Sequence, residues 1–240
     1  ELKEFLNKKN IFLIEDAAHA CGASVGNFKA GNLGDAACFS FFPTKNITTG
    51  EGGMITSSNK QLIRKCSSIR NRGVDLDSEV EQFSHLGSNY RMAEFQAILG
   101  ISQLKKLQSF NKKRNVVAKI YNKMLKPLEE NGTIILPSFS KNIYHSYWRY
   151  WFQISKPALR EEIKDGMSKG FIDIDWAYTP LLHLQPIFKK MYKTKEGMLP
   201  QSELLSKSHV CLPIHHNISR KDAEYIGNCL LSTFANLGIK

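Results

Sequence analysis

Residues 11–53, IFLIEDAAHACGASVGNFKAGNLGDAACFSFFPTKNITTGEGG, place two charged side chains after two apolar runs. The first run, Ile11–Ile14, is rich in branched residues and leads to an acidic pair that ends in Asp16. Such a run is typical of a buried parallel strand. The second run, residues 36–42, leads to Lys45. Because ligands of open α/β sheets bind at the carboxyl ends of strands, the pattern predicts a site that contains Asp16 and Lys45.

A lysine and a carboxylate at neighbouring strand ends suit pyridoxal 5'-phosphate. The lysine amine can bind the cofactor aldehyde covalently, and the carboxylate can face the ring nitrogen and keep it protonated. A protonated ring withdraws electrons from the carbon that loses a proton. The alternative for each residue taken alone is structural, with Asp16 as the cap of a following helix and Lys45 as a loop lysine.

Several motifs resemble those of the DegT-type nucleotide-sugar aminotransferases, a branch of the fold-type I pyridoxal-phosphate enzymes. They are EDAAH at 15–19, GDAACFSFFPTKN at 34–46, GEGG at 50–53, NYRMAEFQA at 89–97, LHLQPIF at 182–188 and CLPIHHNIS at 211–219. The resemblance covers nearly the whole chain. It implies an α/β fold with a three-layer α/β/α large domain, present in part, and a small C-terminal α/β domain.

The resemblance also implies roles for four residues of the first motifs. Lys45 matches the lysine that binds the cofactor, and Asp16 matches the acid at the ring nitrogen. His19 falls where the family has Gln or His beside the cofactor ring. Ser40 matches the serine that donates to the cofactor phosphate, with a serine on the polar side of a strand as the alternative. Relatives that dehydrate sugars have His in place of the lysine, so Lys45 favours transamination.

The NYR segment, residues 89–91, precedes a long helical pattern over residues 95–128. In the family this segment reaches the active site of the neighbouring subunit. The resemblance therefore implies a homodimer with composite sites, in which Asn89 contacts the partner's cofactor phosphate and Arg91 contacts substrate. The alternative for Asn89 is a helix cap, and the two roles can coexist.

The implied reaction transfers an amino group from glutamate or glutamine to a keto group of a nucleotide-linked deoxysugar, in deoxyaminosugar and surface polysaccharide biosynthesis. GEGGMI and NYRM resemble the 4-keto members slightly more than the 3-keto members. His183 lies where relatives place a residue near the sugar nucleotide, and a packed surface histidine is its alternative. The alternative function is a regulatory or sensor protein of the same family that binds cofactor without transaminase turnover.

Composition is ordinary for a globular protein, with 240 residues, 42% hydrophobic and 23% charged, and no apolar run is long enough to cross a membrane. The start, ELKEFLNKKN, lacks a signal-peptide core, and the five cysteines are scattered. We therefore expect a cytoplasmic protein with reduced thiols. The net charge of +11 is spread over separate segments. The spread of the charge disfavours nucleic-acid binding, whereas its positive sign suits an anionic substrate. The positive charge is also the one argument for the alternative of a plain nucleic-acid-binding or structural domain.

No metal site is expected. His215 and His216 lie near Cys211, but adjacent histidines usually point apart on an extended chain and a third ligand is not evident. The acids of residues 75–81 lack the glycine and terminal Glu of an EF-hand loop.

The long helical pattern is expected to bridge two domains. Residues 1–114 would form the C-terminal part of the cofactor-binding large domain, and residues 115–240 the small C-terminal domain. Compared with the family, the chain is expected to lack the first strands of the large domain and part of the phosphate cradle.

Overall fold

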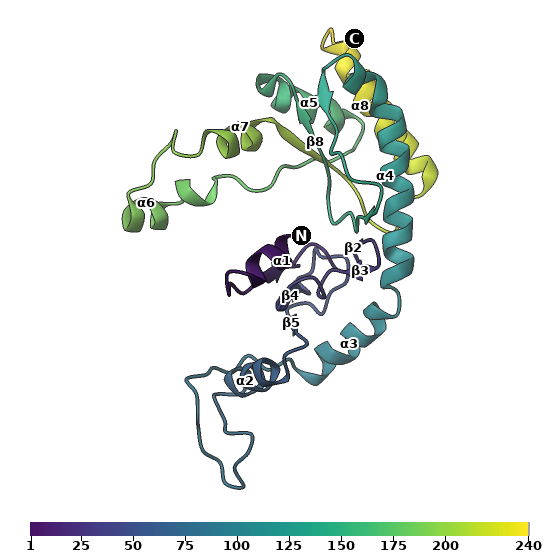
Figure 1. Cartoon of the computed structure of the whole chain (residues 1–240). Coiled ribbons are helices and arrows are strands. Elements are labelled where there is room, and N and C mark those ends of the chain that lie inside the picture. The colour runs from purple at the N-terminus through teal and green to yellow at the C-terminus, as the bar shows by residue number, and fades with distance from the viewer. Residues whose placement is uncertain (240) are drawn as a thin grey trace. The chain divides into compact units, whose positions relative to one another are not determined.

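The computed structural model describes residues 1–239 and consists of two compact units (Figure 1). Unit 1 contains residues 1–112 and 140–148, and unit 2 contains residues 113–139 together with the chain from residue 149 onward. Residues 140–148 thus return to unit 1 although residues of unit 2 precede and follow them in the chain.

A three-stranded sheet forms the centre of unit 1. Its strands are β1 (Ile14–Asp16), β4 (Ala36–Ser40) and β5 (Gly53–Thr56), in the order β1-β4-β5. Strand β1 is parallel to β4, and β5 returns antiparallel to β4. The two predicted strands are confirmed, and β5 returns after the glycine-rich stretch at residues 50–53. The carboxyl ends of β1 and β4 therefore meet at the same edge of the sheet.

The first strand differs from the prediction in length and burial. It begins at Ile14 rather than Ile11, and the side chains of Ile11, Phe12 and Ile14 are exposed. The physical reason is its position: β1 is an edge strand, and in residues 1–239 its one partner strand is β4. An apolar run predicts a buried strand only where another layer covers it.

Unit 1 also contains a second small sheet and the helices α1 and α2. A small sheet with the order β3-β2-β7 joins β2 (Ser24–Val25) to β3 (Phe28–Lys29) and to β7 (Ile143–Tyr144), which attaches residues 140–148 to unit 1. Helix α1 (Leu2–Asn7) precedes β1, and α2 (Lys60–Arg70) follows β5. The Asn59 side chain caps α2 by accepting a hydrogen bond from the Leu62 N–H at 3.1 Å.

The predicted long helix is two helices, α3 (Glu94–Leu104) and α4 (Leu107–Glu130). Between them, the Lys106 N–H donates to the Gln103 carbonyl at 2.9 Å, a tighter turn than the α-helical one. The N-cap of α3 is Ala93, whose N–H donates to the Gln96 side chain, so Asn89 is not the cap of this helix. Helix α4 runs from unit 1 into unit 2.

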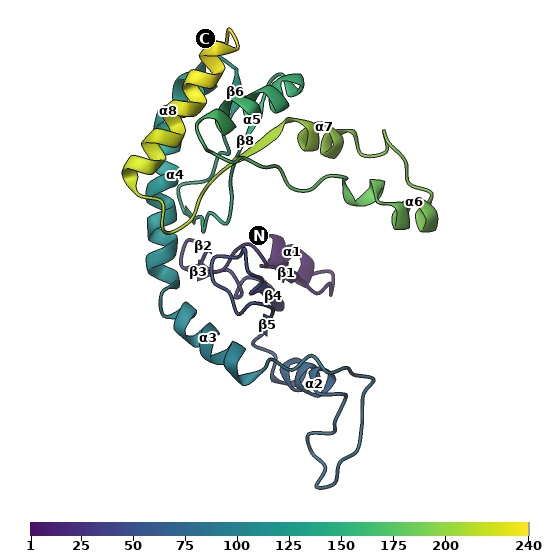
Figure 2. The same cartoon turned by 180° about the vertical axis from the view of Figure 1, so that it is seen from behind.

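Unit 2 has an antiparallel sheet with the order β6-β8-β9, formed by β6 (Ile134–Ile135), β8 (Tyr150–Ile154) and β9 (His209–Leu212). It packs with α4, α5 (Arg160–Lys169) and α8 (Arg220–Asn236), and the core is fully buried at Tyr121, Tyr150, Phe152, Ile163, Leu230 and Phe234. Helices α4 and α8 lie side by side in both views (Figures 1 and 2). At Gly227 a Cβ atom would lie 2.5 Å from the Met124 sulfur, so glycine permits this close approach.

The remaining elements of unit 2 are the short helices η1 (Pro157–Leu159), η2 (Leu182–Leu184) and α6 (Pro186–Tyr192), and helix α7 (Pro200–Ser208). The Ser-x-x-acid spacing of Ser219 and Asp222 predicts a capping pair, and the structure confirms it at the start of α8. The apolar residues at 171–176 favour a strand, but this prediction is wrong, because within the segment only Asp175 forms a bridge, to Cys211. No helix in residues 1–239 is long and apolar enough to cross a membrane.

Candidate active site

Asp16 and Ser40 project from the same face of the sheet in unit 1. Asp16 lies in register with Cys38 on the parallel neighbour, and Ser40 is two residues further along β4. Residues in register share a face, and so do residues two apart on a strand. Asp16 is exposed and Ser40 is half-buried. This placement brings a carboxylate and a hydroxyl to the carboxyl edge of the sheet.

Local hydrogen bonds orient the carboxylate. The Ala18 N–H donates to Asp16 Oδ1 at 3.1 Å. On the opposite face, the carboxylate of Glu15 accepts N–H groups from Gly31, Leu33 and Gly34 at 2.9, 2.7 and 2.7 Å. Glu15 therefore anchors the end of β1 to the loop before β4. Sequence reasoning missed this role, because the three partners are backbone groups that no residue pattern specifies.

Lys45 lies in the turn that follows β4, where its N–H donates to the Phe42 carbonyl at 3.0 Å. The side chain is half-buried, and its Nζ lies 4.4 Å from the ring centroid of Trp148. The imidazole of His19 stacks on the same indole, with ring centroids 3.6 Å apart and ring planes 19° apart. The structure thus brings the predicted residues Lys45 and His19 together through Trp148, a residue that sequence reasoning did not single out.

A buried amide network anchors this turn. Asn46, 5% exposed, donates through Nδ2 to Asn111 Oδ1 at 2.8 Å and to the Ser146 carbonyl at 2.7 Å. Asn111 Nδ2 donates to the Cys21 carbonyl at 2.9 Å, and Ser146 Oγ donates to the His19 carbonyl at 3.0 Å. These hydrogen bonds connect four parts of the chain: the turn after β4, the segment after β1, the start of α4 and residues 140–148.

Burial raises the pKa of the Cys21 thiol to about 11, so this cysteine is neutral.

Asn89 and Arg91 lie on the surface of unit 1. Arg91 Nε donates to Asn89 Oδ1 at 2.9 Å, and the backbone of Asn89 forms an isolated bridge with Asn71. Both side chains are exposed. These two residues therefore present one amide and one guanidinium together on the segment before α3.

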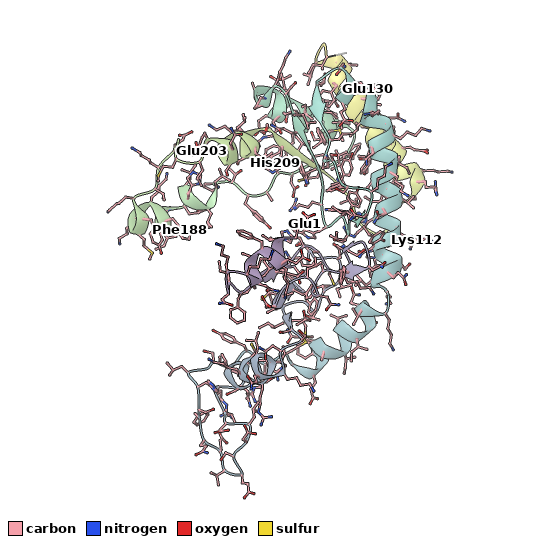
Figure 3. All side chains as sticks on the ribbon, in the orientation of Figure 1. Glu1, Lys112, Glu130, Phe188, Glu203 and His209 are labelled. Carbon is pink, nitrogen blue, oxygen red and sulfur yellow. The ribbon has the colours of Figure 1, made fainter. Side chains whose placement is uncertain are left out.

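His183 belongs to unit 2, where it lies in η2 with 10% of its side chain exposed. Its Nε2 lies 2.9 Å from Oε1 of Glu203, which also accepts the N–H groups of Gly197 and Leu199. The Gly197 N–H, followed by the His183 side chain, holds the pKa of Glu203 below its usual range. Figure 3 marks Glu203 on α7. This cluster closes the loop between α6 and α7, and no spacing in the sequence links Glu203 to His183.

The histidine pair at 215–216 is not part of a metal centre in the described chain. Burial and the nearby guanidinium of Arg114 lower the pKa of both His215 and His216. Within residues 1–239, no group of three or more His, Cys, Asp or Glu side chains is placed to hold a metal ion.

The side chains at the sheet edge of unit 1 fit pyridoxal 5'-phosphate chemically. Asp16 supplies a carboxylate for a protonated ring nitrogen, and Ser40 supplies a hydroxyl for the phosphate. Lys45 supplies a primary amine for the aldehyde. The hydrogen bond from the Phe42 N–H to Ser40 Oγ is long, 3.4 Å, and leaves the hydroxyl proton available to a phosphate oxygen.

Comparison with known proteins finds relatives that match more than nine tenths of this chain. The chain is 32% identical over 236 residues to the UDP-4-amino-4,6-dideoxy-N-acetyl-beta-L-altrosamine transaminase of Campylobacter jejuni serotype O:23/36, covering 97% of this chain and 61% of that protein. It is 33% identical to a pleiotropic regulatory protein of Geobacillus stearothermophilus, covering 91% of this chain and 57% of that protein. The chain thus spans about three fifths of the length of the relatives it matches.

Two solved structures share the fold. Helicobacter pylori PseC, an aminotransferase involved in the biosynthesis of pseudoaminic acid, superposes with a TM-score of 0.87 at 26% identity, covering 98% of this chain and 62% of that one. DesV of S. venezuelae, in complex with a ketimine intermediate, also gives 0.87 at 26% identity, covering 96% and 60%. The predicted fold-type I architecture is confirmed by these superpositions.

The model of one protein family matches residues 1–231, almost the whole chain. The prediction of the family is confirmed, and with it the prediction of pyridoxal 5'-phosphate as the cofactor that this family uses. The chain belongs to the DegT/DnrJ/EryC1/StrS aminotransferase family.

Proposed function

We propose that the whole protein is a pyridoxal-phosphate-dependent aminotransferase that acts on a nucleotide-linked keto-deoxysugar, with glutamate or glutamine as the amino donor. The observation that carries the proposal is the placement of Asp16 and Ser40 on one sheet face, with Lys45 in the turn after the same strand as Ser40. Similarity to the Campylobacter transaminase supports it.

Four residues of unit 1 would each bind a different part of the cofactor or lie beside it. When bound, pyridoxal phosphate supplies an electron-withdrawing ring that stabilises charge on the reacting carbon. The Asp16 carboxylate, oriented by the Ala18 N–H, would hold a proton on the ring nitrogen. Ser40 Oγ would donate to the phosphate, and His19 would lie beside the ring. Lys45 Nζ would bind the aldehyde carbon and, once released, move a proton between the two reacting carbons.

The two parts of the chain would have separate tasks. Residues 1–114 would form the C-terminal part of the cofactor-binding large domain, and residues 115–240 the small C-terminal domain. Residues 140–148 would serve the cofactor-binding side, because they contact the turn that carries Lys45.

The active site would be completed in a homodimer, in which each site contains residues from both subunits. Asn89 and Arg91 are exposed and paired with each other, so both present polar groups to a second copy. Asn89 would donate to the phosphate held by the partner, and Arg91 would contact substrate. His183 would contact the sugar nucleotide through its Nδ1 side, because its Nε2 is paired with Glu203.

The substrate proposed is a 4-keto sugar rather than a 3-keto sugar. The Campylobacter relative is named for a 4-amino sugar, which supports the weak preference of the GEGGMI and NYRM motifs. The net charge of +11 would favour encounter with an anionic nucleotide diphosphate. The product would enter deoxyaminosugar and polysaccharide biosynthesis, and we propose that the protein acts in the cytoplasm.

A regulatory protein is the second candidate, because one relative at 33% identity is a pleiotropic regulatory protein. Such a protein would keep Lys45 and the cofactor and would transfer no amino group. Its Asp16, Ser40 and Lys45 would then serve binding alone.

One experiment separates the two candidates. The full-length protein is loaded with pyridoxal phosphate and mixed with glutamate or glutamine while its absorbance spectrum is recorded. An aminotransferase replaces the band of lysine-bound cofactor with that of the amine form, and then aminates a keto sugar from a panel of UDP-, GDP- and dTDP-linked 4-keto and 3-keto deoxysugars. A spectrum that stays unchanged with every amino donor contradicts transamination and supports the regulator.

A further inference from the structure

Residues 140–148 form a segment that lies against the Lys45 turn. The segment is attached to unit 1 by β7, and its Asn142 carbonyl accepts the Gly26 N–H at 2.7 Å. Its Ser146 carbonyl accepts Asn46 Nδ2 beside Lys45. The end of the segment is therefore fixed relative to the turn, and Trp148 is its last residue.

Trp148 contacts both the turn after β4 and the segment after β1. Its indole N–H donates to the Thr44 carbonyl at 2.8 Å. Its ring lies 4.4 Å from Lys45 Nζ and stacks on His19 at 3.6 Å. A cation near an aromatic face is attracted by the electron density of the ring, and indole provides the strongest such attraction. The hydrogen bond to Thr44 restrains the ring, and the ring restrains both functional side chains.

We propose that Trp148 is a positioning residue, which fixes the Lys45 amine and the His19 imidazole at the edge where the cofactor binds. This inference rests on the proposed function, because Lys45 and His19 are assigned there. Trp148 is half-buried rather than sealed in a core, and it contacts the predicted site residues Lys45 and His19 and the backbone of Thr44. Its role is thus to limit the positions that the Lys45 amine can adopt before and during proton transfer.

The first test uses cofactor-free, full-length protein, so that it does not depend on turnover. Lysine amines are converted to ¹³C-dimethylamines, and the Lys45 signal is assigned by its loss in Lys45→Arg. An amine held over the indole gives a methyl resonance displaced by the ring current. We expect Trp148→Leu to return that resonance to the position of exposed lysines, and Trp148→Phe to keep part of the displacement.

Trp151→Leu is the matched control, because Trp151 is exposed on β8 of unit 2. It should leave the Lys45 resonance unchanged. The wild-type protein alone can also overturn the proposal, if its Lys45 resonance lies at the position of exposed lysines. The proposal can therefore be tested even if Trp148→Leu does not fold.

The second test measures turnover in the holoenzyme. A misplaced lysine should lower kcat by about 10- to 100-fold, with little change in the KM for the nucleotide sugar. Trp148→Phe should restore most of kcat, because it keeps an aromatic ring. Equal kcat for wild type and Trp148→Leu would refute positioning. If the wild type transfers no amino group, the proposed function fails, while the resonance measurement still decides whether Trp148 positions Lys45.

Discussion

The side-chain amide of Asn46 donates to Asn111 Oδ1 at 2.8 Å, across 65 positions of sequence. Both residues are buried, and the same Asn46 amide also donates to the Ser146 carbonyl. The residue next to Lys45 therefore joins three separate parts of unit 1. The position of Lys45 depends on this junction as well as on the strand that precedes it.

Asn46→Ala should destabilise the protein by about 1–3 kcal/mol, because it removes two buried hydrogen bonds, to Asn111 Oδ1 and to the Ser146 carbonyl. Urea unfolding measures the loss, and cofactor titration shows whether the Lys45 turn is displaced. Asn27→Ala is the matched control, since Asn27 is exposed in unit 1 and should change stability by at most about 0.5 kcal/mol. Similar losses in both variants would show that the junction is unimportant.

Lys45→Ala in the full-length protein should abolish the absorbance of covalently bound cofactor and abolish turnover, because no other group can replace the amine at that place. Lys29→Ala removes an exposed lysine of β3 and should change neither property. If Lys45→Ala retains turnover, Lys45 is not the lysine that binds the cofactor.

Asp16→Asn keeps the shape of the side chain and removes its charge. Cofactor should still bind, while kcat falls by about 100-fold or more, because the ring nitrogen loses the charge that keeps it protonated. Spectroscopic titration measures binding, and steady-state kinetics measures kcat. Asp173→Asn, an exposed residue of unit 2, is the control. A near-normal rate in Asp16→Asn would mean that another group opposes the ring nitrogen.

The Glu203 cluster should make the stability of unit 2 depend on acid pH. The pKa of Glu203 is lowered in the folded protein, first by the Gly197 N–H and then by His183. Its stabilising contribution is therefore complete above the unfolded-state pKa of about 4.3 and is lost as pH falls through the lower folded-state pKa. Urea midpoints between pH 6 and 3 should fall more steeply for wild type than for Glu203→Gln.

Glu224→Gln provides the comparison for this measurement, since Glu224 is an exposed residue of α8. It should retain the wild-type pH dependence. If Glu203→Gln shows that same dependence, the cluster does not couple protonation to folding.

Asn89→Ala should weaken cofactor binding by about 10- to 100-fold, as expected for one hydrogen bond to a charged phosphate. The decisive test mixes Asn89→Ala subunits with Lys45→Ala subunits. In a hybrid dimer, one of the two sites combines an intact Lys45 with an intact Asn89. Random mixing should therefore restore about a quarter of wild-type activity, because half of the dimers are hybrids.

Composite sites would be contradicted if hybrid dimers form and no activity returns. Two different affinity tags, one on each variant, verify that hybrid dimers are present. A monomeric mass for the intact protein with full cofactor affinity would have the same meaning, because the site would then be complete within one chain.

The sequence predicted the elements whose signals are local. The apolar run before Asp16, the strand before Lys45 and the cap at Ser219 are each specified by neighbouring residues, and the structure contains all three. The helix over residues 95–128 was predicted in one piece, because its apolar spacing continues across the turn at 105–106.

Contacts between distant residues could not be predicted in this way. Trp148 lies within an alternating apolar stretch that resembles a strand, and nothing near it indicates contact with Lys45, more than 100 positions earlier. The pairing of Glu203 with His183 is likewise set by the closure of a loop through backbone groups. Such partners depend on tertiary packing rather than on local pattern.

The polypeptide crosses between the two units at residues 112–113, 139–140 and 148–149. Neither unit is therefore encoded by one uninterrupted stretch of gene. A chimera made with a relative by a single crossover near residue 112 would keep Lys45 from one parent and take Trp148 and Ser146 from the other. A chimera that keeps these contacts therefore has to inherit residues 140–148 and the Lys45 turn from the same parent.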